Sequence, residues 1–323
     1  MSALAETIAI QGRVLDHVLD LDLEPALARL QGAARVWLLG TGTSEHAACL
    51  GAAMLATAGL DARASSAAAF VAAAPPLDDA DALIVISHTT ATAFARRVRD
   101  DALAAGSRLV TITAEGKDWP EAIEAAPPER SETYTASYLA ALLVLARLTL
   151  ALGGEEWTAA DLAALPGLVE GTGVEPLPVA APPRRLTVLF GAGPAAVTAR
   201  EGALKLREAA RVLAEGFEAE YLLHGSAVPL TSEDHLIALD PGGDPSGLTA
   251  SLAVAAEREG IPVAAVDPPP DLHPLLAQLP LTVRLQALAC RWADRQGIDP
   301  DRVIHGAWAD AALWTLGAPQ KTG

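Results

Sequence analysis

A short apolar run that ends in glycine, followed by a small turn and a long helical segment, occurs twice in this chain of 323 residues. The two apolar runs are Arg35–Gly40 and Leu186–Gly191, and the helical segments after them are Ser44–Ala58 and Pro194–Ala214. Strands that alternate with helices predict a parallel sheet covered by helices on both faces. The repeat therefore predicts an α/β fold in which one unit is duplicated.

Further segments of the same kind continue both halves of the chain. We expect strands at 82–87, 108–113, 235–240 and 261–266, helices at 91–105, 134–152 and 246–259, and a leading helical segment at 3–30 that Pro25 interrupts. Five prolines between 165 and 185 indicate a connection between domains. We predict a first domain at 1–165, a linker at 166–185 and a second domain at 186–323.

Charge and cysteine content exclude several classes of protein. The formal net charge of −17 and the pI of about 4.7 oppose nucleic acid or an anionic membrane surface as a partner. Cys49 and Cys290 lie far apart in the sequence, which argues against a disulfide framework and a structural zinc site. The N-terminus does not resemble a signal peptide, and no apolar run is long enough to span a bilayer. We expect a cytoplasmic protein.

Two acids and a lysine recur at helical spacing in the segment 201–208, and a histidine follows in the next loop. Glu201, Lys205 and Glu208 share one face of the predicted helix, and His224 comes sixteen residues after Glu208. Lys205 is expected to help hold Glu208 ionised as a general base. The alternative is a solvated Glu–Lys–Glu face with an unrelated histidine.

Two hydroxyl-rich turns follow predicted strands in the first half. The turn 40–45, Gly-Thr-Gly-Thr-Ser-Glu, lacks the third glycine of the dinucleotide fingerprint, so a nicotinamide site is not expected. The second turn, 87–92, reads Ser-His-Thr-Thr-Ala-Thr. The carboxyl ends of neighbouring parallel strands face one crevice, where the two turns can bind one phosphate-like group. Ordinary helix capping is the alternative for either turn alone.

These three segments resemble the sugar-isomerase (SIS) family. The chain is similar, from about 36 to 301, to the isomerase domain of glucosamine-6-phosphate synthase and to fructosamine-phosphate deglycase-like proteins. The resemblance implies two tandem SIS domains. Each is expected to be a doubly wound, mostly parallel five-stranded sheet flanked by helices, a three-layer flavodoxin-like or Rossmann-like sandwich.

The resemblance also implies a role for each site residue. Glu208 corresponds to the base that moves a proton between C1 and C2 of the open-chain sugar, Lys205 to the lysine one turn before it, and His224 to the ring-opening histidine. In that family this histidine arrives from the neighbouring subunit, which implies a homodimer. The predicted substrate-binding residues are Gly42, Thr43, Ser44, Ser87, His88, Thr89, Thr92 and Thr135. No metal or organic cofactor is expected.

The chain departs from the family pattern at three places. Thr90 and Ala91 stand where the phosphate loop normally has glycine and glutamate, so the loop is expected to be reshaped or to hold another tetrahedral anion such as a sulfonate. Trp308 occupies the position of a carbonyl-trapping lysine, and Lys321 is the nearest lysine. No segment of this sequence corresponds to a glutamine-hydrolysing domain.

Three functions remain open. The first is an aldose–ketose or aminosugar isomerase that acts on a sugar phosphate or a similarly anionic sugar. The second is an aminosugar-6-phosphate deaminase or a fructosamine-phosphate deglycase, which uses the same base and anion site. The third is a non-catalytic sugar-phosphate sensor, although a binding module has no need of a base at C2.

Overall fold

The computed structural model describes residues 1–172, 177, 179, 181–240 and 242–318, and the chain packs into two compact units. The five-stranded unit contains 11–129, 136–166 and the described residues from 304 onward. The four-stranded unit contains 1–10, 130–135 and the described residues of 167–303. This packing differs from the contiguous ranges that we predicted. Residues 1–10 join the four-stranded unit because the Asp301 carboxylate accepts the N–H groups of Ala3 and Leu4 at 2.7 Å each.

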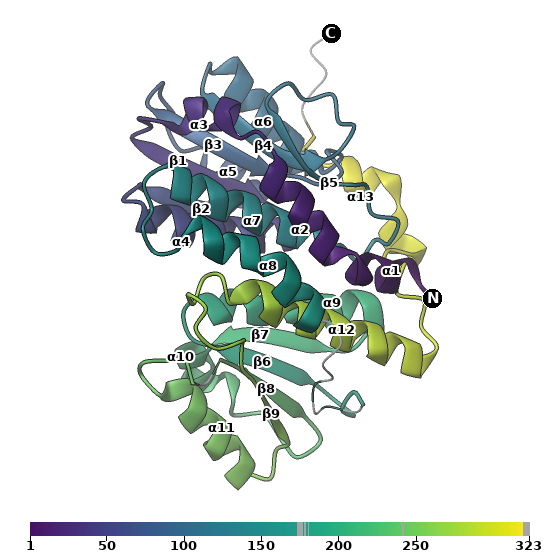
Figure 1. Ribbon diagram of the computed structural model, residues 1–323. Coiled ribbons are helices and arrows are strands. Elements are labelled where there is room, and N and C mark those ends of the chain that lie inside the picture. The colour runs from purple at the N-terminus through teal and green to yellow at the C-terminus, as the bar shows by residue number, and fades with distance from the viewer. Residues whose placement is uncertain (173–176, 178, 180, 241, 319–323) are drawn as a thin grey trace. The chain divides into compact units, whose positions relative to one another are not determined.

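The five-stranded unit is built on a fully parallel sheet. Its strands are β1 (Arg35–Gly40), β2 (Ala62–Ser66), β3 (Asp81–Ile86), β4 (Arg108–Ala114) and β5 (Ala122–Ala126), in the order β2-β1-β3-β4-β5 (Figure 1). All six residues of β3 are buried, as expected for a central strand covered on both faces.

Successive side chains of β1 show how the helices cover that sheet. Leu38 packs toward α4 (Thr43–Thr57) and α7 (Ala136–Ala151), whereas Leu39 lies in a cluster with α5 (Ala67–Ala73) and α6 (Ala93–Ala104). The remaining helices of this unit are α2 (Gln11–Asp20), α3 (Glu24–Leu30), a 3₁₀ turn (Gly306–Ala309) and α13 (Ala311–Thr315). The predicted leading helix is therefore three helices, α1 (Ala3–Ala9), α2 and α3.

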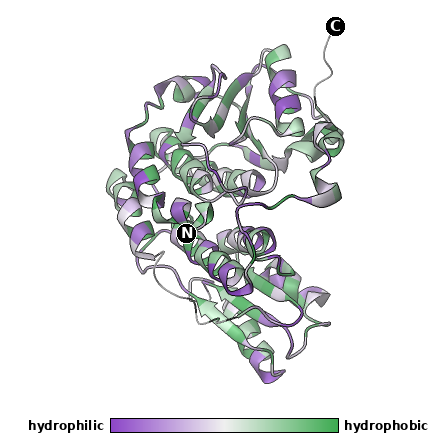
Figure 2. Cartoon of the chain, turned by 90° about the vertical axis from the view of Figure 1, so that its right-hand side faces the viewer, coloured by the Kyte–Doolittle hydropathy of each residue, from purple (hydrophilic) through white to green (hydrophobic). Residues whose placement is uncertain are grey.

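The four-stranded unit has the same three layers. Its parallel strands are β6 (Thr187–Gly191), β7 (Ala214–Glu218), β8 (His235–Leu239) and β9 (Val263–Val266), in the order β7-β6-β8-β9. One face packs against α9 (Pro194–Ala210) and α12 (Gln278–Gln296), and the other against α10 (Ala219–Tyr221) and α11 (Leu248–Arg258). Figure 2 shows mainly hydrophobic residues on these strands. The prediction of five strands in each sheet is wrong here, since the described residues of this sheet form four.

The two sheets share their strand order and the turn after their first strand. In both sheets, the first four strands in chain order lie side by side in the order second, first, third and fourth. Gly42 is the N-cap residue before α4, with φ 60° and ψ −125°. Gly193 is the N-cap residue before α9, with φ 52° and ψ −124°. Residues other than glycine rarely adopt this backbone conformation. The turn that the sequence repeats is therefore repeated in the structure.

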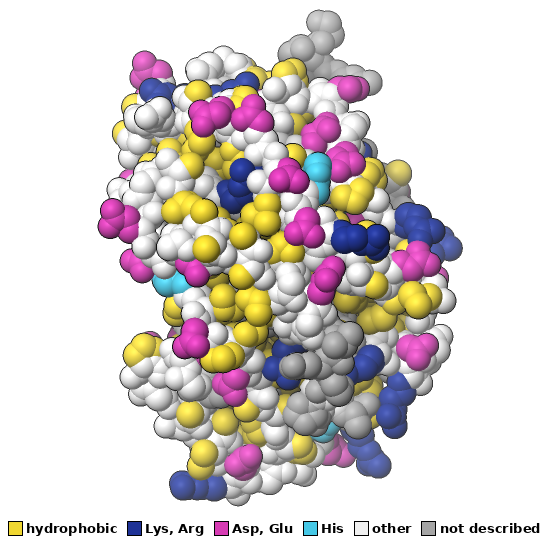
Figure 3. Space-filling view, in the orientation of Figure 1, with side chains coloured by type: hydrophobic (Ala, Val, Ile, Leu, Met, Phe, Trp, Pro, Cys, Tyr) yellow, Lys and Arg dark blue, Asp and Glu magenta, His cyan; other side chains and the backbone are white. Residues whose placement is uncertain are grey.

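The boundary region and the surface add two findings. Helix α8 (Ala159–Thr172) contains Pro166, so the predicted linker begins within a helix. Residues 173–176, 178 and 180 of the predicted linker lie outside the described residues. In the described chain, no helix combines the length and the apolar character needed to cross a membrane. Figure 3 shows acidic side chains dispersed over the visible face, in keeping with the net charge of −17.

Candidate active site

The two hydroxyl-rich turns lie at the same edge of the five-stranded sheet. β1 and β3 are paired, parallel neighbours, and the turns follow their carboxyl ends. After β1, Gly42 precedes the first residue of α4, so Thr43 and Ser44 form the start of that helix. Unpaired N–H groups at a helix start favour an anion. The structure thus confirms the predicted placement of both turns, whereas their ligand is not tested.

Ser87 has a buried hydroxyl without a hydrogen-bond partner. The residue is 3% exposed, and its Oγ contacts no donor or acceptor among the described residues. Its N–H donates to the Ile112 carbonyl at 3.0 Å, which fixes the start of the turn to β4. A buried polar group without a partner typically costs about 1–3 kcal/mol, so the hydroxyl is available to a ligand oxygen at low cost.

The rest of the second turn has a backbone conformation that favours glycine, although the turn contains no glycine. Thr90 has φ 58°, and its hydroxyl donates to the Thr89 carbonyl at 2.6 Å. The Thr89 hydroxyl accepts the Ala91 N–H at 3.2 Å. Thr92 begins α6 without a side-chain cap. Threonine in this backbone region costs about 1–3 kcal/mol, and the turn retains the left-handed geometry despite the missing glycine.

His88 is tied to a neighbouring segment of the same unit. Its Nε2 accepts the Glu129 N–H at 3.3 Å, and Glu129 Oε1 in turn accepts the Ser137 N–H at 2.9 Å. Burial lowers the pKa of His88, with Glu129 opposing this and Lys117 adding to it. A neutral ring with Nε2 as an acceptor follows from both observations. His88 therefore orders the turn rather than supplying a positive charge to it.

Thr135, predicted to hold the sugar, lies in the four-stranded unit. It is completely buried, and its carbonyl accepts from Gln286 Nε2 on α12 at 3.5 Å. The long helix predicted to follow it begins at Ala136.

Helix α9 brings the predicted catalytic residues together. Pro194 occupies its first turn, and Ala199, Ala203 and Leu206 pack in the hydrophobic core. Lys205 and Glu201 are both 0% exposed, and Lys205 Nζ lies 3.4 Å from Glu201 Oε1. The same Nζ lies 2.6 Å from Glu208 Oε2. The alternative of a solvated charged face is therefore wrong.

Burial has the largest effect on the pKa of Glu208. Burial raises the pKa of the Glu208 carboxyl; Lys205 opposes the rise through its charge and hydrogen bond, and Glu201 adds to it. Lys205 acts in the predicted direction, but burial outweighs it. A carboxylate whose pKa is moved toward neutrality is a better proton acceptor than an ordinary glutamate. The side chain remains 20% exposed, so a substrate can reach it.

His224 lies on an irregular turn and points to solvent. Residues 222–226 form a π-helical turn in which His224 has φ −81° and ψ 48°, and Gly225 has φ 109°. Its side chain is 71% exposed, with Nε2 3.8 Å from Glu220 Oε1. Tyr221, Leu223 and Val228 beside it are 65%, 54% and 84% exposed. Within the described chain, the ion pair of His224 is with Glu220 rather than Glu208.

Three features near these residues were missed or left open by the sequence. Glu201 was recognised at helical spacing but was given no role. It is buried beside Lys205, and its charge raises the pKa of Glu208. Glu129 and Gln286 had no local signal, because their contacts join residues distant in sequence. Trp308, which was predicted to stand at the position of the family's lysine, is 76% exposed; Lys321 lies outside the described residues. No metal-holding group of three His, Cys, Asp or Glu occurs among the described residues.

Comparison with known proteins finds a family match that includes the residues of α9. The family described as "SIS domain" matches residues 184–270, which contain the four strands of the second sheet, α9 and His224. The match covers one such domain, whereas two in tandem were predicted. The matched segment contains Glu201, Lys205 and Glu208 together.

Longer similarities extend beyond the matched segment. The chain is 28% identical over 306 residues to the glutamine–fructose-6-phosphate aminotransferase (isomerizing) of Gloeobacter violaceus, covering 83% of this chain and 50% of the relative. It thus spans about half the length of that curated relative. Its fold is similar to glucosamine-6-phosphate deaminase from Thermotoga maritima (TM-score 0.77, 19% identity, 94% and 98% coverage). Tagatose-6-phosphate ketose/aldose isomerase from Escherichia coli gives TM-score 0.74, 18% identity, and 95% and 97% coverage.

Proposed function

We propose that this chain is an isomerase that moves a proton between neighbouring carbons of an anionic sugar, converting an aldose or imine to a ketose or enamine. The Lys205–Glu208 pair on α9 carries the proposal, since it supplies a base with a raised pKa inside the segment that matches the SIS domain. The names of the similar proteins support the substrate class, because they refer to fructose 6-phosphate, glucosamine 6-phosphate and tagatose 6-phosphate.

The chemistry needs one base that serves two carbons and an anchor that fixes the sugar. In this proposal Glu208 removes the proton from one carbon and returns it to the next, so no net proton is gained or lost. Lys205 stabilises the ionised form of Glu208 and holds its Oε2 in place. Fixing the substrate relative to the base raises the effective concentration of the reacting groups.

The remaining predicted residues serve binding and ring opening. Ser44, Ser87, Thr89 and Thr92 are proposed to bind the phosphate or a similar tetrahedral anion, with His88 ordering their turn. Thr135 is completely buried, so the contact with the sugar that was predicted for it is not part of this proposal. His224, which is exposed within its own chain, is proposed to complete the site of a second copy, so the active species is a homodimer.

Proton exchange in D₂O tests this function directly. The protein is incubated with fructose 6-phosphate, glucosamine 6-phosphate and an anionic sugar without phosphate, and deuterium at C1 and C2 is followed by NMR. Incorporation that depends on Glu208 supports the isomerase and identifies the tolerated anion. Binding without exchange for all three sugars contradicts it and favours a sensor.

A second candidate is release of ammonia or an amine from a phosphorylated aminosugar. The fold similarity to the T. maritima deaminase, over 94% of this chain, is the observation that favours it. The same proton transfer at Glu208 would precede release of the amine. Ammonia formed from glucosamine 6-phosphate, measured with a coupled assay, separates the two: exchange without ammonia identifies the isomerase.

A further inference from the structure

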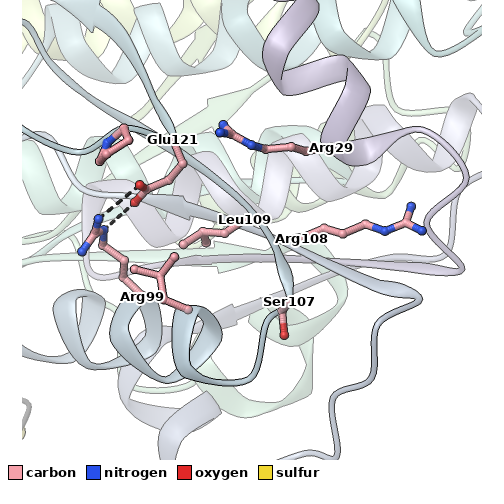
Figure 4. Close-up of a pocket in the computed structure, with 8 residues that line it drawn as sticks. Arg29, Arg99, Ser107, Arg108, Leu109 and Glu121 are labelled. Atoms are coloured by element: carbon pink, nitrogen blue, oxygen red, sulfur yellow. Dashed lines mark hydrogen bonds and ion pairs between the residues drawn. The ribbon is translucent and has the colours of Figure 1, made fainter.

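A hollow of about 320 Å³ lies at the amino end of β4, within the five-stranded unit (Figure 4). Its size falls within the range of small-molecule sites. Leu109 contributes apolar surface and Ser107 a hydroxyl. Three half-buried arginines from different elements line it, namely Arg29 of α3, Arg99 of α6 and Arg108 of β4. The hollow thus combines an apolar surface with several strong donors.

One of the three arginines is already neutralised. Arg99 forms two hydrogen bonds with Glu121, one of them 3.1 Å long from its Nη2. The pair is well shielded, with side chains 14% and 7% exposed. Arg99 also lies over the Trp119 ring, 4.4 Å from its centroid. Glu121 is the acid that lines the hollow, and this pairing offsets its charge.

The other two arginines retain unused donors. Arg108 donates from Nη1 to the Gln31 carbonyl at 2.9 Å, and a carbonyl leaves its positive charge in place. Arg29 forms no hydrogen bond or ion pair with any described residue. In Figure 4, Arg29 extends toward the Arg99–Glu121 pair, whereas the guanidinium of Arg108 points the other way. Two of the residues that line the hollow therefore have a guanidinium group without an acidic partner in the described chain.

This concentration of positive charge is unusual for the chain and lies far from the predicted anion turns. The protein has 40 acidic and 23 basic residues, whereas this hollow is lined by three arginines and one acidic residue. Arg108 begins β4, while the N–H of Ala114 at its other end donates to the His88 carbonyl at 3.0 Å. Seven residues of strand separate the two places by roughly 20 Å.

We propose that this hollow is a second anion site, which binds a small molecule with two acidic groups, either carboxylates or phosphates. Arg29 and Arg108 each bind one acidic group, because a planar guanidinium pairs with either group through parallel hydrogen bonds. Leu103, which lines the hollow and is 48% exposed, contacts the part of the ligand between them. The site is independent of the proposed isomerase chemistry, because it shares none of its residues.

NMR of the arginine side chains tests the site in the intact protein. The Nε–Hε signals are followed in ¹⁵N-arginine-labelled protein during titration with citrate and with pyrophosphate at constant ionic strength. The signals of Arg29 and Arg108 are expected to shift saturably, while that of the exposed Arg13 on α2 does not. Saturation by citrate or by pyrophosphate shows which acidic group the site prefers. Acetate, which has a single carboxylate, is expected to bind at least about tenfold more weakly.

Two variants complete the test. Arg29→Gln is expected to weaken binding about tenfold, and the control Arg13→Gln to leave it unchanged. The proposal would be overturned if the Arg29 and Arg108 signals shifted without saturation, as that of Arg13 is expected to do. Equal affinity of the wild type and Arg29→Gln would overturn it as well. The wild-type titration needs no variant, so the result does not depend on a variant that folds.

Discussion

Lys205 Nζ lies 2.6 Å from Glu208 Oε2 and 3.4 Å from Glu201 Oε1, so one buried lysine on α9 is placed between two carboxylates. Two acids and one base leave this group with a net negative charge when all three are ionised. Charged groups are rarely retained in an interior without a partner or a function, because their desolvation costs several kcal/mol each. Burial raises the pKa of Glu208 against the opposing effect of Lys205, and this raised pKa makes Glu208 the candidate base.

Glu208→Gln is expected to lower proton exchange by about 10²-fold or more while the affinity for the sugar changes by only a few fold. The amide has the same shape as the carboxyl group but cannot take up a proton. NMR exchange rates and calorimetric binding of the same sugar measure both effects. The control is Glu257→Gln on the exposed face of α11. A wild-type exchange rate in Glu208→Gln would exclude Glu208 as the base.

The pH dependence of kcat/KM provides a second test of the same group. The base must be ionised, so kcat/KM is expected to rise with pH through the pKa of Glu208, with a midpoint above the 4.5 of an ordinary glutamate. Glu201 raises the pKa of Glu208 through its charge. Glu201→Gln is therefore expected to move the midpoint to lower pH. A slower variant with an unmoved midpoint would indicate a purely structural role for Glu201.

The partnerless hydroxyl of Ser87 predicts opposite effects on stability and on binding. Ser87→Ala removes a buried group without a hydrogen bond, so the free energy of unfolding is expected to stay within about 0.5 kcal/mol or to increase. The affinity for a sugar phosphate is expected to fall about tenfold. Denaturant unfolding and calorimetry measure the two quantities.

Thr187→Val is the matched control for this variant, because Thr187 Oγ1 on β6 is also buried and lacks a partner in the described chain. It should resemble Ser87→Ala in stability and wild type in affinity. Equal affinity of Ser87→Ala and wild type would remove Ser87 from the anion site.

Central strands were predictable from the sequence, whereas of the edge strands only β9 was predicted. The strand β3 reads Asp-Ala-Leu-Ile-Val-Ile and is buried throughout, so its composition reveals it. The edge strands β2 and β7 read Ala-Arg-Ala-Ser-Ser and Ala-Glu-Gly-Phe-Glu, and both are partly exposed. Their pairing depends on the neighbouring strand. The predicted helix at 194–214 ends at Ala210, where Arg211 takes φ 52°, and this shortening makes room for β7.

The candidate site shows the same limit. The spacing of Lys205 and Glu208 fixed their contact, because residues three apart share a helix face. Their burial depends on what packs over α9, and α12 in particular lies nearly 70 residues further along the chain. The local sequence therefore predicted the effect of Lys205 on the pKa of Glu208 but not the larger, opposite effect of burial. Long-range packing, which a local sequence pattern does not contain, determined the burial of Lys205 and Glu208.

Asp244 predicts an acid-dependent loss of stability. Its carboxylate accepts hydrogen bonds from Ser246 and Thr249, and these lower its pKa to about 2 despite an opposing effect of burial. A lowered folded-state pKa stabilises the protein above the ordinary value of 3.8, and this contribution is lost as pH falls from 3.8 toward 2. Asp244→Asn is expected to cost about 1–2 kcal/mol at pH 7 and less near pH 3. A pH-independent difference in urea unfolding would contradict the assignment.

Co-expression of two inactive chains tests the proposed role of His224 across a dimer. Glu208→Gln retains His224, and His224→Ala retains Glu208, so a mixed dimer holds one site with both groups. Random pairing is expected to restore about a quarter of the wild-type exchange rate. Chains with different affinity tags, purified over both tags in turn, isolate the mixed dimer and show that pairing has occurred. The expected rate in that purified species is about half of wild type, because one of its two sites is complete. Purified mixed dimers that remain inactive would show that His224 does not complete the partner's site.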